Sequence, residues 1–239
     1  MPNSREIKDV LEAVKALPGD WHRSGSLHPS VMEKLAEIGQ NIRIQHSVET
    51  GTGKSTLLLS HLSESHTVFT QDDSGNGDSL HATRNSTLLR KDRVSFVVGP
   101  TQKTLPKWNS QHPLQLVLID GPHGYPFPEL EYFCLYPCLE TGGILIIDDI
   151  NIPTVFHLYQ VLLEDEMYHL EALVRTTAFL RRTGAPVFDQ YGDGWWNQGY
   201  NKSRLPIVIP EMGLGILDRL KMYIPLDMKR SIKRILRKP

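Results

Sequence analysis

The stretch VETGTGKST, residues 48–56, lies where the pattern of the chain changes from alternating to helical. Residues 42–48 alternate in a way that predicts a strand, and residues 55–62 carry an apolar run that predicts a helix. Glycines at 51 and 53 allow a tight turn between them, so that the backbone can approach a ligand closely. Because free N–H groups and a positive dipole end face this turn, the stretch predicts a binding loop for a nucleotide or a carboxylate.

The same order of strand and helix continues along the chain. Further strands are predicted over 67–71, 94–98, 114–119, 144–147, 169–176 and 178–182, and helices over 5–17, 31–40, 78–90, 128–139 and 155–165. The alternation predicts a Rossmann-like α/β fold, with a mostly parallel sheet, helices on both faces and a final antiparallel pair of strands.

Four regions are expected along the chain. They are N-terminal helices that cover the site (1–40), a ligand-binding core (41–183), an aromatic and glycine-rich lid loop (184–213) and a basic amphipathic tail (214–239). The last 24 residues hold eight Lys or Arg and two Asp, which leaves 18 basic against 25 acidic residues elsewhere. A basic amphipathic tail can lie on an anionic membrane surface; the other interpretations are a docking helix with a solvated basic face and a contact within a homo-oligomer.

Composition excludes several classes of protein. The 239 residues are 40% hydrophobic and 22% charged, which allows a sizeable core and excludes a disordered chain. The net charge of −1 argues against a nucleic-acid partner. Two cysteines, Cys134 and Cys138, are too few for a disulfide-rich scaffold, and no apolar run is typical of a signal peptide or a membrane span. We therefore expect a cytoplasmic protein, for which peripheral membrane contact through the tail is one possibility.

Two interpretations of the loop after the first strand are open from its residues alone. Residues 53–55 match the end of a P-loop, but Val48 stands where that motif has its first glycine. The other interpretation is an E-x-G-x-G motif of Glu49, Gly51 and Gly53, in which the acid faces the amine of a ligand.

Further candidate contacts to a cofactor follow this loop and the second strand. Ser55 or Thr56 stands where a dinucleotide motif has its third glycine, which makes NAD a poorer candidate. Asp72 follows the second strand, where an acid can accept hydrogen bonds from ribose hydroxyls, and Asp73 is the alternative to it.

Acidic residues also follow the two most apolar strands of the predicted sheet. Asp120 comes directly after the fourth strand, and Asp148 and Asp149 after the fifth. Because ligands bind at the carboxyl ends of parallel strands, we expect these acids to converge and to hold Mg²⁺ or a similar cation. The alternative is that they bind the cofactor or cap helices. His123 could take a proton from a hydroxyl or be structural.

The motifs ETGTG (49–53), IDGPHGY (119–125) and GGILIIDD (142–149), with Asp72 between them, resemble those of class I S-adenosylmethionine-dependent methyltransferases. The resemblance covers about residues 30–182 and is nearest to small bacterial O-methyltransferases related to catechol and antibiotic-sugar O-methyltransferases. It implies a seven-stranded sheet with an antiparallel last strand and S-adenosylmethionine as cofactor.

The resemblance also implies roles for individual residues. The ETGTG motif would cradle the methionine end of the cofactor, Asp72 would hold its ribose, and the loop that contains Thr101 would lie near the adenine. In metal-dependent relatives, acids that match Asp120, Asp148 and Asp149 hold a divalent cation. In sugar-methylating relatives a histidine is the base, for which the nearest candidate is His123.

Aromatic residues suggest the acceptor. Trp195 and Trp196 in the expected lid, together with Tyr125, could contact a sugar ring, although the two tryptophans could instead fill the edge of the core. We expect an O-methyltransferase that acts on a hydroxyl of a sugar, a glycoconjugate or a related small molecule. The alternatives are a P-loop-like nucleotide-binding protein and a noncatalytic membrane-peripheral module.

Overall fold

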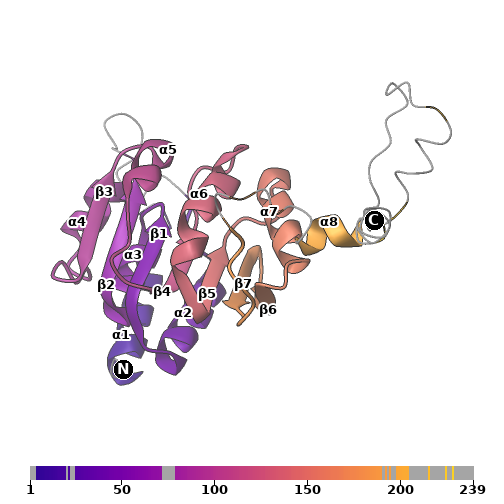
Figure 1. The fold of residues 1–239 in the computed structure, drawn as a ribbon. Helices are drawn as coiled ribbons and strands as arrows, with labels where there is room; N and C mark the ends of the chain where they lie inside the picture. The colour runs from indigo at the N-terminus through magenta and orange to yellow at the C-terminus, as the bar shows by residue number, and fades with distance from the viewer. Residues whose placement is uncertain are drawn as a thin grey trace.

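The computed structural model describes residues 4–19, 21, 25–71, 79–189, 192, 194, 198–204, 215, 224 and 228. Within this part of the chain, seven strands form one sheet in the order β3-β2-β1-β4-β5-β7-β6 (Figure 1). The strands are β1 (Ile44–Thr50), β2 (Ser63–Thr70), β3 (Val94–Val98), β4 (Leu114–Ile119), β5 (Leu139–Ile147), β6 (Tyr168–Val174) and β7 (Thr177–Arg182). Strands β1 to β5 pair in parallel, whereas β7 runs antiparallel to both β5 and β6. This confirms the predicted fold class.

Helices cover both faces of the sheet (Figure 1). They are α1 (Ser4–Lys15), α2 (Pro29–Asn41), α3 (Lys54–Leu62), α4 (Ser79–Asn85), α5 (Thr101–Thr104), α6 (Phe127–Leu135), α7 (Pro153–Leu163) and α8 (Gly199–Ser203), with 3₁₀ turns at Leu105–Lys107 and Tyr136–Cys138. Two hydrophobic clusters lie on opposite faces of the sheet. Leu116 and Leu118 of β4 enter the cluster with α1, α2 and α3, and Val117 and Ile119 enter the one with α6 and α7. This double burial is why β4 is apolar throughout.

The ends of the central parallel strands are in register. Thr50 pairs with Ile119 across β1 and β4, and Ile119 pairs with Ile147 across β4 and β5. The residues that follow these three strands therefore emerge side by side at one edge of the sheet, as the sequence predicts. We call this the strand-end edge.

One informative boundary error in the prediction concerns β2. Helix α3 leads directly into this strand, which begins at Ser63 rather than at 67. Ser63 and His66 are buried polar residues, and both join a hydrogen-bonded chain through Ser47. The strand therefore begins with polar residues whose burial the apolar pattern could not indicate.

Because β7 runs antiparallel to β5, its last residue lies at the end of the strands opposite to the strand-end edge. There the Thr183 N–H donates to the Met167 carbonyl (2.9 Å), and the Tyr136 hydroxyl donates to the Phe188 carbonyl (2.7 Å). The described part of the expected lid, 184–213, thus begins on the wrong side to cover the strand-end edge, because β7 runs antiparallel to the strands that carry the site.

The N-terminal helices also lie differently from the expectation. Helices α1 and α2 pack against α3 and one face of the sheet, not across the strand-end edge. The Lys54 ammonium donates to the Leu17 carbonyl (2.8 Å), which brings the segment after α1 to the rim of that edge. Among the residues described, no helix has the length and apolar character to cross a membrane. Apart from residues 215, 224 and 228, the basic tail lies outside the described residues.

Candidate functional site

The glycine turn after β1 packs directly against the end of β4. Gly51 has a φ of +95°, and a Cβ at this position would lie 2.5 Å from the Asp120 carbonyl oxygen. The Asp120 N–H in turn donates to the Thr50 hydroxyl (3.1 Å). Only a glycine fits this turn, both because of its φ and because the neighbouring loop is so close. The turn and the Asp120 loop therefore form one unit.

Glu49 lies at the end of β1 but points into the protein. Its side chain is 1% exposed and accepts hydrogen bonds from Ser55 (2.8 Å), from Thr56 and from the ring of His66 (3.1 Å). The acid that was expected to face a ligand amine therefore has three internal partners. Sequence reasoning missed His66, whose only signal was a histidine beside an apolar strand.

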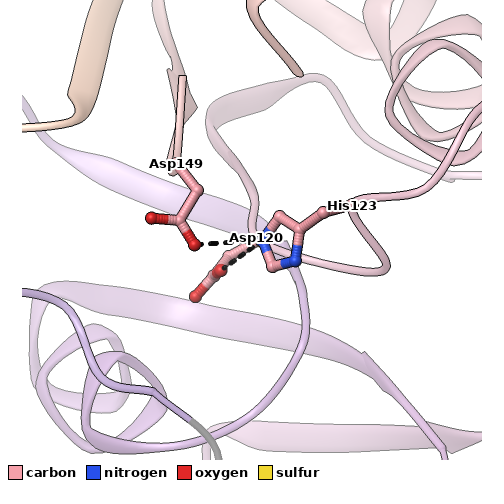
Figure 2. Close-up of side chains that lie close together, drawn as sticks. All are labelled: Asp120, His123 and Asp149. Atoms are coloured by element: carbon pink, nitrogen blue, oxygen red, sulfur yellow. Dashed lines mark ion pairs between the residues drawn. The ribbon is translucent and has the colours of Figure 1, made fainter. Parts of the chain in front are cut away.

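Asp120, His123 and Asp149 gather at the strand-end edge (Figure 2). His123 Nε2 lies 3.3 Å from Asp149 Oδ2 and 3.8 Å from Asp120 Oδ1. Asp120 follows β4, His123 lies three residues later on the same loop, and Asp149 follows β5. One potential ligand atom from each residue lies within 4.8 Å of the others, which is close enough for all three to contact one cation.

Local backbone features direct these side chains toward one another. Asp149 has a φ of +54°, a left-handed conformation that aspartate tolerates better than most residues. The loop that carries His123 is anchored to α7, because the Thr154 hydroxyl donates to the His123 carbonyl. The sequence indicates neither feature.

Asp148 does not join this cluster. Its side chain is 9% exposed and accepts a hydrogen bond from the Thr177 hydroxyl at the start of β7. The predicted cation ligands were Asp120, Asp148 and Asp149, whereas the structure brings together Asp120, His123 and Asp149. Asp148 is held by Thr177 of β7, whereas the left-handed backbone at Asp149 turns the next side chain toward His123.

The carboxylates at the strand-end edge repel one another electrostatically. Burial raises the pKa of Asp120 well above its ordinary value, and the nearby charges of Asp148, Glu49, Asp149 and Glu131 raise it further. Burial also raises the pKa of Asp148, and its hydrogen bond from Thr177 opposes that shift. A divalent cation would relieve this repulsion.

Two observations indicate that this cluster could hold a cation. His123 Nε2 is a buried atom with no hydrogen-bond partner among the described residues, although two carboxylates lie near it. Carboxylate oxygens with one imidazole form a donor set that suits Mg²⁺ or Mn²⁺ better than a thiol-preferring metal. Asp120, His123 and Asp149 are therefore the residues that could hold a metal.

The remaining predicted residues are dispersed. Thr101 is buried at the start of α5, and its hydroxyl faces Glu131 of α6. Tyr125 is 75% exposed, two residues after His123. The other predicted contacts, Asp72, Asp73, Trp195 and Trp196, lie outside the described residues.

A sheet of this order, with a glycine turn after β1 and acids after β4 and β5, defines the class I methyltransferase fold. In agreement, residues 48–150 match the family model of a methyltransferase domain. Residues 48–150 therefore correspond to a methyltransferase domain. The P-loop interpretation of residues 53–55 is wrong.

Solved structures share this fold at low sequence identity. TomG, an O-methyltransferase from Streptomyces achromogenes involved in tomaymycin synthesis and solved with SAM, has a TM-score of 0.56 and 13% identity, covering 74% of this chain and 89% of its own. An O-methyltransferase from Bacillus cereus in complex with SAH has a TM-score of 0.55 and 16% identity, and the match covers 77% of this chain and 93% of its own. The SAH-bound methyltransferase PaMTH1 from Podospora anserina has a TM-score of 0.55 and 14% identity, and the match covers 77% of this chain and 89% of its own. A search of curated protein sequences found no match.

Proposed function

We propose that this chain transfers the methyl group of S-adenosylmethionine to a hydroxyl of a sugar, a glycoconjugate or a related small molecule, with the help of a divalent cation. One observation carries the proposal: Asp120, His123 and Asp149 face one another beside the glycine turn (Figure 2). A neutral amine presents a free lone pair to the methyl group, whereas a hydroxyl must lose a proton as it attacks. A base beside two carboxylates therefore favours a hydroxyl acceptor.

The glycine turn is the proposed binding site of the cofactor. The space beside Gly51 is taken by the Asp120 loop, so the proposed contact is with the start of α3 at Gly53, where N–H groups favour a carboxylate such as that of the methionine moiety. Contacts of Asp72 or Asp73 with the ribose, and of Thr101 with the adenine side, stay predictions.

The proposed reaction needs alignment and removal of one proton. Methyl transfer from a sulfonium is an in-line displacement, so the acceptor oxygen must lie opposite the leaving sulfur. His123 Nε2 is the proposed base, because it has no hydrogen-bond partner within the described part of the chain and lies near both carboxylates. Asp120 and Asp149 would hold the cation, whose charge lowers the pKa of a coordinated hydroxyl.

The exposure of the cluster supports a polar acceptor. The side chains of Asp120, His123 and Asp149 are 27%, 37% and 39% exposed, so each is partly accessible from solvent even though the Nε2 atom of His123 is buried. A sugar offers several hydroxyls to such a surface. The exposed ring of Tyr125 could stack on the apolar face of a sugar.

An assay with labelled S-adenosylmethionine tests this proposal. The protein is incubated with a panel of sugars, sugar nucleotides and catechols, in Mg²⁺ or in EDTA, and labelled products are identified. We expect label on a sugar hydroxyl, loss of product in EDTA and in Asp149→Asn, and full activity in the control Glu166→Gln, an exposed acid beyond the cluster. Labelling of catechols alone would contradict the sugar acceptor, and activity that survives both EDTA and Asp149→Asn would contradict the cation.

The role of His123 can be separated from that of the cation. If His123 is the base, His123→Ala lowers the rate and changes its pH dependence, while Mg²⁺ binding measured by calorimetry is retained. Loss of Mg²⁺ binding in this variant would instead make His123 a metal ligand. If the wild-type protein bound neither S-adenosylmethionine nor S-adenosylhomocysteine, the noncatalytic module would become the better account.

We also propose that residues 216–239 bring the enzyme to an anionic membrane, where a lipid-linked glycan would be the acceptor. The excess of six positive charges among apolar residues supports this part of the proposal. Deletion of residues 216–239 should abolish co-sedimentation with anionic vesicles. Equal sedimentation with and without the tail would contradict it, and a shift in oligomeric state on deletion would favour an oligomer contact instead.

A further inference from the structure

A chain of buried polar side chains runs beneath the glycine turn. Glu49 of β1 is 1% exposed, and the ring of His66 on β2 has no exposed surface. His66 Nε2 lies 3.1 Å from Glu49 Oε1, and His66 Nδ1 lies 2.8 Å from the Ser47 hydroxyl. Ser47 is joined to Ser63 by a further contact of 2.6 Å between their hydroxyl oxygens. Both ring nitrogens of His66 are therefore engaged, which fixes the plane of the ring.

The donor and acceptor groups of these side chains determine the direction of each hydrogen bond between them. A carboxylate oxygen accepts hydrogen bonds, so His66 donates to Glu49 through Nε2. In the tautomer with its proton on Nε2, the ring accepts from the Ser47 hydroxyl through Nδ1, and Ser47 accepts from Ser63. In this arrangement each polar atom that links the four side chains has a partner, as buried polar groups require.

The same carboxylate reaches the cofactor loop on its other side. Glu49 accepts from Ser55 (2.8 Å) and from Thr56, both in the first turn of α3. The Thr56 hydroxyl in turn accepts from the Gly53 N–H (3.1 Å). The orientation of His66 is thus passed through one carboxylate to the turn whose backbone the cofactor must approach.

We propose that His66 is a positioning residue for the cofactor, which orients Glu49 so that Glu49 holds Ser55, Thr56 and the Gly53 turn in their binding conformation. The ring does not reach the strand-end edge itself, because it is fully buried inside β2. Its effect is on the affinity for the cofactor and not on the chemistry at His123. The inference rests on the proposed function only in requiring that the protein binds S-adenosylmethionine or its product.

Binding of S-adenosylhomocysteine, measured by calorimetry, tests the inference. His66→Phe keeps a ring but removes both nitrogens, and we expect the Kd to rise about tenfold or more, since the hydrogen bond lost is one to a charged group. His66→Gln, whose amide can still donate to Glu49, should recover part of the affinity. In turnover, His66→Phe should raise the KM for S-adenosylmethionine and leave the KM for the acceptor unchanged.

Two matched controls separate positioning from a general loss of stability. Leu162→Ala creates a cavity in the opposite cluster, at the far end of α7, and should lower the thermal midpoint without changing the Kd. Ser63→Ala removes the last member of the chain without touching Glu49 and should change the Kd less than His66→Phe.

The outcomes are distinguishable. A folded His66→Phe protein that binds S-adenosylhomocysteine as tightly as the wild type overturns the inference. If His66→Phe does not fold, His66→Asn replaces it, since its shorter amide does not span the distance to Glu49, and an unchanged Kd in that variant overturns the inference equally. No binding by the wild-type protein would contradict the proposed function instead.

Discussion

Replacement of Glu131 by glutamine is expected to stabilise the folded protein at neutral and alkaline pH. Glu131 lies on α6 with no exposed surface, and neither carboxylate oxygen has a hydrogen-bond partner within the described residues. Burial raises the pKa of Glu131 to about 7, although the hydroxyls of Thr50 and Thr101 act in the opposite direction. The carboxyl packs against Gly121, where a Cβ would overlap it. The charged form of Glu131 is thus unfavourable in the folded state.

The magnitude follows from the linkage between protonation and folding. A group whose pKa is higher in the folded state contributes stability that is complete below its unfolded pKa and is lost as pH rises through its folded pKa. For Glu131 that window runs from 4.5 to about 7. A difference of this size corresponds to about 3 kcal/mol in the free energy of unfolding. The glutamine in the Glu131→Gln variant does not titrate, so the free energy of unfolding of this variant does not fall over that range of pH.

Urea denaturation in EDTA, at a series of pH values from about 5 to about 9, measures the effect. The stability of Glu131→Gln relative to the wild type should increase across this range by about 3 kcal/mol. Glu166→Gln is the matched control, because it removes an exposed carboxylate, and its curve should stay parallel to that of the wild type.

Parallel curves for Glu131→Gln and the wild type would refute this reasoning, since they would mean that Glu131 titrates alike in the folded and unfolded states. A constant loss of stability at every pH would be a second refutation. It would show that the carboxylate makes hydrogen bonds that an amide cannot replace.

Three other changes test the geometry of the site. Gly51→Ala places a Cβ 2.5 Å from the Asp120 carbonyl at a φ of +95°, so it should cost about 1–3 kcal/mol of unfolding free energy and abolish S-adenosylhomocysteine binding in calorimetry. Asp149→Ala should be less stable than Asp149→Gly by about 1 kcal/mol in urea denaturation, because only glycine accepts a φ of +54° freely; equal stabilities would contradict this. Thr177→Val removes the hydroxyl that holds Asp148 and should cost about 1–3 kcal/mol at neutral pH; wild-type stability would show that this hydrogen bond contributes nothing.

The sequence predicts the strand-end edge well because the periodicity of the chain determines it. The runs at 114–119 and 144–147 alternate between two hydrophobic clusters, so their ends and the acids after them must lie at one edge. Gly51 could also be predicted, since a tight turn beside another loop leaves few residues that fit.

The direction of individual side chains could not be predicted in the same way. Glu49 is the first residue of the E-x-G-x-G motif, yet its side chain points inward. Its partner His66 lies on β2, the strand adjacent to β1 in the sheet, and no local pattern indicates that contact. Asp148 and Asp149 are neighbours in sequence, but Thr177 of β7 holds the first and a left-handed backbone turns the second toward His123. Such contacts depend on pairings between distant segments.

Five carboxylates crowd this edge of the sheet, and the structure compensates them in different ways. Glu49 has three internal hydrogen-bond donors, and Asp148 has the hydroxyl of Thr177. Glu131 is the most buried, and its raised pKa keeps much of it protonated near neutral pH. Burial and the neighbouring acids raise the pKa of Asp120 as well, and among the described residues Asp120 and Asp149 share the imidazole of His123. The cation of the proposed function would offset the charge where Asp120 and Asp149 meet, and it need not contact the three acids that have partners or a raised pKa elsewhere.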